Sequence, residues 1–221
     1  MEQKQVLEIL KELNANSEKR KFSQSYDLII NLKNLDLKKP EQQIDSAVVL
    51  HNSTGKKRKI AAIVGPEMLA QARGVCDKVL TIEDAANEFK EKRQIKKLAN
   101  EYDFFIAQAT IMPKIAMQFG KTFGPRGKMP NPKLGCVVPP QANLKQLYDR
   151  LQTTVVVKAK AQPVIQARVG SESMKVEEVA DNIMTLYNGV VHLLPSEKNN
   201  IRSIYLKFTM GKPVRLDAVK E

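Results

Sequence analysis

KIAAIV, the stretch Lys59–Val64, decides the fold of the middle third of this 221-residue chain. Its short apolar run predicts a buried strand. Pro66 to Arg73 then predicts a helix that Pro66 opens and Gly74 closes. A second apolar stretch, YDFFIA at Tyr102–Ala107, predicts another buried strand. Because β-α units repeat, this region is predicted to form a small parallel sheet with helices on both faces.

Five further segments complete the middle third. Lys78–Leu80 predicts a short strand, and the T-x-x-D pattern of Thr81 and Asp84 predicts the start of a helix that reaches Leu98. Pro113–Phe119 and Asn143–Leu151 predict two more helices. The glycines and prolines of Gly120–Pro140 between them predict a long loop.

The two ends of the chain show a different, α+β pattern. Met1–Leu13 has apolar residues at helical spacing, and Val176–Tyr187 predicts a second amphipathic helix. Strands are predicted at Ser25–Leu32, Ile44–His51 and Ile201–Phe208, and a hairpin at Thr153–Lys160 and Pro163–Val169. We therefore predict an α/β fold of two domains. Residues 1–55 and 153–221 form a discontinuous α+β domain with an antiparallel sheet, and residues 56–152 form an inserted, Rossmann-like three-layer domain joined to it by a hinge.

The charge of the chain indicates its partner. The formal net charge is +12, from 36 Lys and Arg against 24 Asp and Glu, which favours a polyanion. Membrane association is disfavoured because no apolar run is long enough to span a bilayer, and Met1–Leu13 lacks the pattern of a signal peptide. Cys76 and Cys136 lie too far apart for a zinc motif and suit a reducing, cytoplasmic location. We expect no metal and no cofactor.

Enzymatic function is disfavoured by the motifs. The residues before Gly120-Lys121-Thr122 lack the first glycine of a P-loop, and Gly65-Pro66-Glu67 does not fit the dinucleotide fingerprint. No G-x-S-x-G elbow occurs, and His51 and His192 lie beside apolar residues, where a structural histidine is the usual case. We predict that the chain is not an enzyme.

Three segments combine cations with polar and small residues at the edges of predicted elements. They are Lys21–Ser25, Gln166–Ser171 and Lys207–Pro213. Lys and Arg neutralise phosphates, hydroxyl and amide groups bond ribose and base edges, and Phe or Met can lie against a base. Phe22 and Met210 could instead be ordinary core residues. The alternative of a DNA-binding regulator stays open, although no helix-turn-helix pattern is present.

Two motifs carry a resemblance to a known family. Phe123–Lys133 reads FGPRGKMPNPK and is similar to the G-P-R-G-x-x-P-N-P-K signature of the L1 family of ribosomal proteins, and Thr209-Met210-Gly211 matches its T-M-G triad. The resemblance covers essentially the whole chain and is closest to the archaeal and eukaryotic branch. It implies a protein of the large ribosomal subunit that is a monomer when free, binds rRNA at the mobile stalk and assists release of deacylated tRNA from the E site. It also implies repression of translation through its own mRNA.

The resemblance assigns roles to individual residues. Those implied to bind RNA are Lys21, Phe22, Gln24, Ser25, Gln166, Arg168, Gly170, Thr209, Met210, Gly211 and Lys212. Bacterial relatives often have Glu where Gln24 stands and His where Gln166 stands. An auxiliary role in an interdomain loop is implied for Gly124, Arg126, Gly127 and Lys133.

Overall fold

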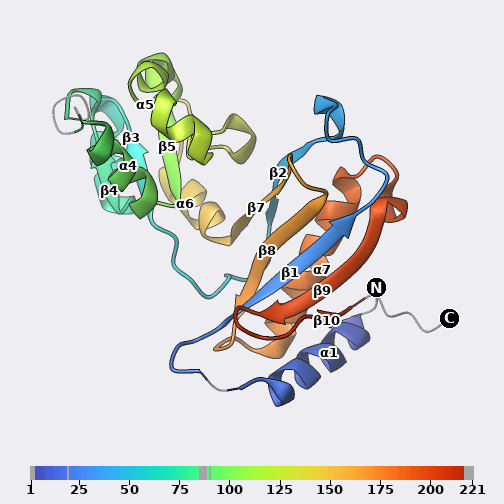
Figure 1. Ribbon diagram of the computed structural model, residues 1–221. Coiled ribbons are helices and arrows are strands. Elements are labelled where there is room, and N and C mark those ends of the chain that lie inside the picture. The colour runs from blue at the N-terminus through green and yellow to red at the C-terminus, as the bar shows by residue number, and fades with distance from the viewer. Residues whose placement is uncertain (1–2, 19, 85–88, 90, 217–221) are drawn as a thin grey trace. The chain divides into compact units, whose positions relative to one another are not determined.

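The computed structural model describes residues 3–18, 20–84, 89 and 91–216 (Figure 1). The chain divides into two compact units. The discontinuous unit consists of Met1–Lys56 and Thr153–Glu221, and the inserted unit consists of Lys57–Gln152. Among the described residues, no helix is long and apolar enough to cross a membrane.

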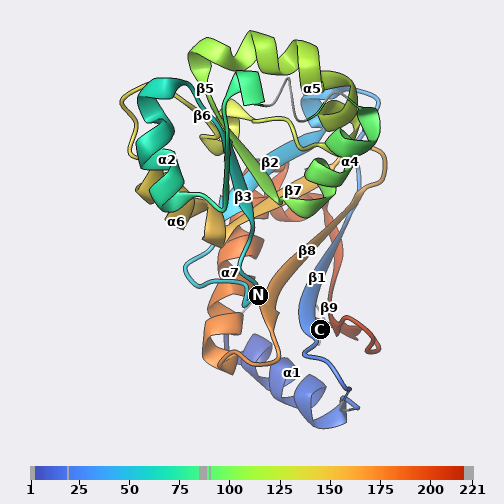
Figure 2. The same ribbon diagram turned by 90° about the vertical axis from the view of Figure 1, so that its left-hand side faces the viewer.

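The discontinuous unit contains an antiparallel sheet in the order β10-β9-β1-β8 and a separate antiparallel pair, β2-β7. Its elements are α1 Gln3–Asn16, β1 Ser25–Leu32, β2 Ile44–Val49, β7 Thr154–Ala159, β8 Val164–Ser171, α7 Val176–Leu193, β9 Ile201–Phe208 and β10 Val214–Arg215. Residues in β1 alternate between half-buried and buried positions, as expected for a strand with one covered face. Helix α7 lies along that face, and α1 packs against α7 (Figures 1 and 2).

The core of this unit comes from both ends of the chain. Val6 and Leu10 of α1, Ile30 of β1, Ile183 of α7 and Leu206 of β9 are all fully or almost fully buried in one cluster. Because these residues lie up to 200 positions apart, neither end can bury its apolar face without the other. The predicted discontinuous α+β architecture is confirmed.

The predicted hairpin of β7 and β8 is wrong. The two strands follow each other in the chain, yet β7 pairs with β2 and β8 pairs with β1. Every residue of β2 from Ile44 to Val49 has a partner in β7. The long-range partners satisfy the backbone groups of both strands, so the chain turns from one sheet into the other between them.

The inserted unit has a parallel sheet in the order β4-β3-β5-β6, which confirms the predicted α/β class. Its elements are β3 Ile60–Ile63, α2 Leu69–Val75, β4 Lys78–Leu80, α4 Lys92–Glu101, β5 Phe104–Gln108, α5 Met112–Arg126, β6 Val137–Val138 and α6 Leu144–Thr153. Strands β3 and β5 are buried at every position, so both faces of the sheet are covered. Residues of α4 and α5 form the core on one face, and Figure 2 shows α2 and α6 on the other side.

The predicted long loop Gly120–Pro140 is wrong at two places, because α5 continues to Arg126 and Val137–Val138 forms β6. Phe119 and Phe123 lie one turn apart on the buried face, with their ring centroids 5.1 Å from each other. The helix ends where Gly127 adopts a φ of +63°. The N–H of Gly127 then donates to the carbonyl of Gly124, and that of Lys128 donates to Phe123, which is the pattern of a Schellman cap. Apolar packing and this cap outweigh the helix-breaking tendency of Pro125.

The predicted single helix from Thr81 to Leu98 is also wrong. The predicted cap is present, since the N–H of Asp84 donates to Thr81 Oγ1 at 3.1 Å. However, Phe89 is not helical, and α4 begins only at Lys92 behind a capping box of Glu91 and Gln94. Residues 85–88 and 90 of the predicted helix lie outside the described residues, as do residues 1 and 2 of the first predicted helix.

Candidate nucleic-acid interface

Three loops meet at one end of the four-stranded sheet. In the antiparallel register, Ser25 at the start of β1 lies opposite Ser171 at the end of β8, and Tyr26 lies opposite Phe208 at the end of β9. Strand order therefore brings together segments that are distant in sequence. We call residues 20–25, 168–172 and 209–212 the loop cluster.

Thr209 connects the first and third segments of the loop cluster. Its N–H donates to the Ser25 carbonyl at 3.1 Å, and its Oγ1 accepts the Ser25 N–H at the same distance. The hydroxyl hydrogen is also directed toward the Ser25 carbonyl, 3.4 Å away. Thr209 thus continues the pairing of β9 with β1 by one residue and fixes the position from which Met210 and Gly211 project.

Gln24 is buried within the loop cluster and hydrogen-bonds to its neighbouring segments. Its side chain is only 2% exposed. The amide nitrogen donates to the Glu18 carbonyl, and the amide oxygen accepts the N–H of Met210, each at 3.4 Å. Its backbone N–H donates to the Glu172 carboxylate, and its carbonyl accepts the N–H of Glu172. The burial of Gln24 indicates that it positions the neighbouring segments.

Gly170 is also buried, and its strand β8 packs against α7. A Cβ at this position would lie 2.8 Å from Cγ2 of Val179. Because real Cβ atoms do not approach so closely, Gly170→Ala should push β8 away from α7 and lower the free energy of unfolding by about 1–3 kcal/mol. Urea unfolding tests this. Gly74→Ala is a suitable control, since a Cβ there meets nothing within 4 Å, and equal stabilities of the two variants would contradict the packing argument.

The remaining predicted residues present polar and cationic groups on the surface. Lys21, Gln166, Thr209 and Lys212 are exposed. Phe22 and Met210 are 52% and 64% exposed, which excludes the alternative that they are core residues. Two large apolar side chains in water beside cations are available for contact with a ligand.

Arg168 has an unusual environment on the open face of the sheet. It pairs in register with Asp27, which pairs on its other side with Lys207. Burial raises the pKa of Asp27, while the charges of Lys207 and Arg168 oppose that shift. The buried Nε of Arg168 has no hydrogen-bond partner within the described part of the chain. Arg168 therefore contributes a positive charge to the open face of the sheet, together with Lys207.

The G-P-R-G signature lies in the inserted unit, away in sequence from the loop cluster. Gly124 and Arg126 belong to the last turns of α5, Gly127 caps it, and Lys133 is exposed in a short 3-10 helix that Asn131 caps. Arg126 Nε donates to Asn100 Oδ1 at 3.4 Å, which joins α5 to α4. The segment forms a helix end within its own unit, and an auxiliary role for it stays a prediction.

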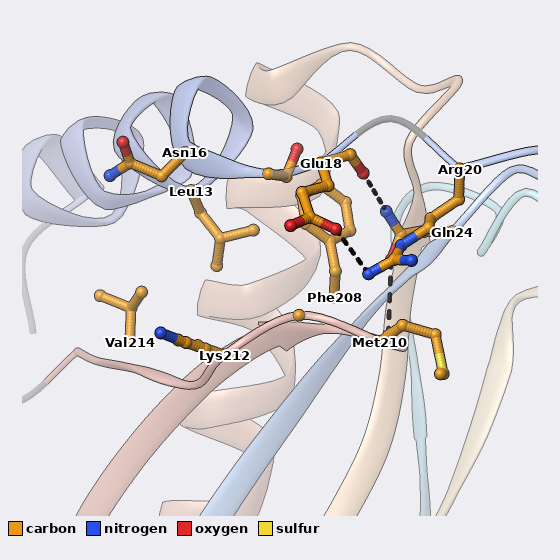
Figure 3. Close-up of a pocket in the computed structure, with 11 residues that line it drawn as sticks. Leu13, Asn16, Glu18, Arg20, Gln24, Phe208, Met210, Lys212 and Val214 are labelled. Atoms are coloured by element: carbon orange, nitrogen blue, oxygen red, sulfur yellow. Dashed lines mark hydrogen bonds and ion pairs between the residues drawn. The ribbon is translucent and has the colours of Figure 1, made fainter.

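Sequence reasoning missed a pocket of about 500 Å³ that adjoins the loop cluster (Figure 3). Leu13 at the end of α1, Phe208 at the end of β9 and Val214 of β10 provide apolar walls. Arg20 and Lys212 line it as well. The segments Lys21–Ser25 and Lys207–Pro213 contain part of its lining, but the sequence does not show that they meet α1, because the walls come from elements more than 190 residues apart.

Groups suited to catalysis are not evident in the described residues. Both cysteines are free, and burial raises the pKa of Cys76 and of Cys136 to about 11, so both stay protonated thiols at neutral pH. Within the described ranges, no three His, Cys, Asp or Glu side chains are grouped as metal ligands. His51 Nδ1 contacts Asp181 Oδ2 at 2.9 Å, on the exposed surface of the discontinuous unit.

The fold and the loop cluster define a basic, two-unit protein of the kind that assembles with a polyanion. The chain belongs to the ribosomal protein L1p/L10e family, whose sequence profile matches residues 11–212. This confirms the resemblance seen in the sequence. As a member of a family of ribosomal proteins, the chain is not an enzyme, and it works in the cytoplasm as part of the ribosome.

Relatives from three archaea match nearly the whole chain, and each is named large ribosomal subunit protein uL1. The protein of Methanothermococcus thermolithotrophicus is 41% identical over 217 residues, which cover 98% of this chain and 100% of the relative. That of Methanobrevibacter smithii is 42% identical over 214 residues, covering 96% and 98%. That of Pyrococcus horikoshii is 39% identical over 217 residues, covering 98% and 97%.

Proposed function

We propose that this protein is a component of the large ribosomal subunit that binds rRNA of the mobile stalk through the loop cluster. The observation that supports this most directly is the meeting of three segments, distant in sequence, in a surface that carries Lys21, Arg168 and Lys212 beside exposed Phe22 and Met210. Cations bind phosphates, and flat or soft apolar side chains lie against sugars and bases.

Binding through phosphate contacts has a measurable signature. Counterions leave the RNA when Lys and Arg neutralise phosphates, so the logarithm of affinity should fall linearly with the logarithm of salt concentration. Filter binding of the full chain to a stalk rRNA fragment measures this slope. Duplex DNA of equal length serves as competitor, and preference for the duplex would favour the DNA-binding alternative.

Two single substitutions test separate parts of the loop cluster. Phe22→Ala removes an exposed ring, and Thr209→Ala removes the hydroxyl that holds Ser25. Each should weaken binding to stalk rRNA by about 1–3 kcal/mol, by loss of a stacked base or of a positioned loop. Filter binding measures both. Thr209→Ser keeps the hydroxyl and should retain most of the affinity, whereas wild-type affinity of Phe22→Ala would remove that ring from the interface.

Two further roles belong to the same proposal. The subunit component assists release of deacylated tRNA from the E site, and it represses translation by binding a similar fold in its own mRNA. Both are motivated by the family to which the chain belongs. Crosslinking in cells, followed by sequencing of the attached RNA, tests both roles. Absence of tRNA from the products would contradict the role in tRNA release, and absence of the protein's own mRNA would contradict the repressor role.

A further inference from the structure

The pocket beside the loop cluster has the size of a small-ligand site, with apolar walls and a polar, partly cationic rim (Figure 3). Its volume of about 500 Å³ lies within the range of roughly 300–1,000 Å³ that is typical of such sites. Leu13 and Phe208 belong to the buried core of the discontinuous unit, so this side of the pocket is fixed by packing. A rigid apolar wall can contact a flat, weakly polar group without rearrangement of the protein.

A buried amide shapes the polar side of the pocket. The Gln24 amide lines the pocket and makes two hydrogen bonds of 3.4 Å, to Glu18 and Met210. Because Gln24 is only 2% exposed, its amide holds Glu18 and Met210, two residues that line the pocket, in place.

Charges lie among the lining residues as well. Arg20 forms an ion pair of 2.8 Å with Glu18, which orients the guanidinium, and Lys212 follows the Met210-Gly211 turn. Met210, Gly211 and Lys212 belong both to the loop cluster and to the pocket lining. An RNA backbone that follows the loop cluster would therefore pass the pocket, with cations in reach of its phosphates.

We propose that the pocket between the end of α1, β10 and the Met210–Lys212 turn receives the base of one unpaired nucleotide of the bound RNA. This inference rests on the proposed function, because the loop cluster must bring the RNA to the pocket. Insertion of a base against Leu13, Phe208 and Val214 would let the protein recognise an unpaired nucleotide, as distinct from helical RNA, at a single point.

Nuclear magnetic resonance of the full chain tests the pocket directly. The four nucleoside 5′-monophosphates, ribose 5-phosphate and inorganic phosphate are titrated to millimolar concentrations. The readouts are the methyl resonances of Leu13 and Val214 and the side-chain amide of Gln24. At least one nucleotide should shift them, and ribose 5-phosphate should not. Equal shifts with ribose 5-phosphate or phosphate alone would overturn the base pocket in favour of an anion site.

A pocket-filling variant connects the pocket to RNA binding. Ser17→Trp places a large ring at a half-buried position that lines the pocket, and Ser196→Trp is the matched control in an exposed turn before β9. Ser17→Trp should abolish the nucleotide-induced shifts and weaken binding of the stalk rRNA fragment about ten- to a hundredfold, as expected for one stacked base. The control should change neither.

The results distinguish this inference from the proposed function. Unshifted pocket resonances, together with unchanged rRNA affinity of a folded Ser17→Trp variant, would overturn the base pocket and leave the rRNA-binding proposal intact. Failure of the wild-type chain to bind the rRNA fragment at all would overturn both. Should Ser17→Trp not fold, Val214→Phe replaces it, because Val214 is half-buried in an edge strand at the opposite wall.

Discussion

Phe208→Ala should lower the free energy of unfolding of the discontinuous unit by about 3–5 kcal/mol, the usual cost of truncating a buried aromatic side chain. Phe208 is 1% exposed, and its ring centroid lies 4.5 Å from that of Tyr26 in the neighbouring strand. The contact between these two rings holds the end of β9 against β1. The position of the Thr209–Lys212 turn, which follows β9, therefore depends on it as well. Urea unfolding followed by circular dichroism measures the loss.

Hydrogen exchange locates the effect of Phe208→Ala. Amides of β1 and β9 should exchange faster in the variant, while amides of β3 and β5 in the inserted unit keep their rates. Phe22→Ala is the matched control, since it removes the same ring from a side chain that is 52% exposed and should change stability by about 0.5 kcal/mol or less. Equal stability of the two variants would mean that the β9 end is not held by this contact.

The strands of the discontinuous unit were the easiest part of the fold to predict. Ser25–Leu32 and Ile201–Phe208 match β1 and β9 at both ends. In β1 the reason is physical, because the alternating period of the sequence coincides with the alternating burial of the strand. Pairing was harder to predict. β7 and β8 are neighbours in the chain, and only the distant partners β2 and β1 decide which sheet each strand joins.

The last turns of α5 were not predicted, because the glycines and the proline of this segment are typical of a loop. Gly120, Gly124 and Pro125 each disfavour helix, which led to the prediction of a loop. Ile115, Phe119 and Phe123 nevertheless lie at four-residue spacing and are all buried. That spacing was visible in the sequence and outweighs the local propensities, since tertiary packing supplies most of the stability of a helix.

The candidate interface was predictable in residue type but not in geometry. The exposed cations and Phe22 follow from the composition of three segments. Gln24 illustrates what the sequence cannot reveal, because its buried amide accepts a hydrogen bond from Met210, a residue 186 positions away. Likewise, the pocket exists only because the end of α1 lies beside β9 and β10. Contacts of this range depend on the completed fold.

Neutralising three cations of the loop cluster should have the largest effect on RNA binding. In the variant Lys21→Gln/Arg168→Gln/Lys212→Gln, each segment of the cluster loses one cation. A charge-assisted hydrogen bond contributes about 1.5–3 kcal/mol, so even partial loss of three such contacts weakens binding to stalk rRNA on the order of a hundred- to a thousandfold. The slope of log affinity against log salt should also fall by about 3, one for each cation.

The control for this variant must lose the same charge elsewhere. Lys92→Gln/Arg93→Gln/Lys96→Gln removes three exposed cations from α4 in the inserted unit, and therefore gives the same net charge as the loop-cluster variant. If general attraction between a basic protein and RNA dominates, both variants weaken equally, because long-range attraction depends on total charge. If the loop cluster holds the phosphates, only its own variant shows the large loss and the reduced salt slope. Equal behaviour of the two variants would therefore disprove a localised interface and leave net charge as the cause of binding.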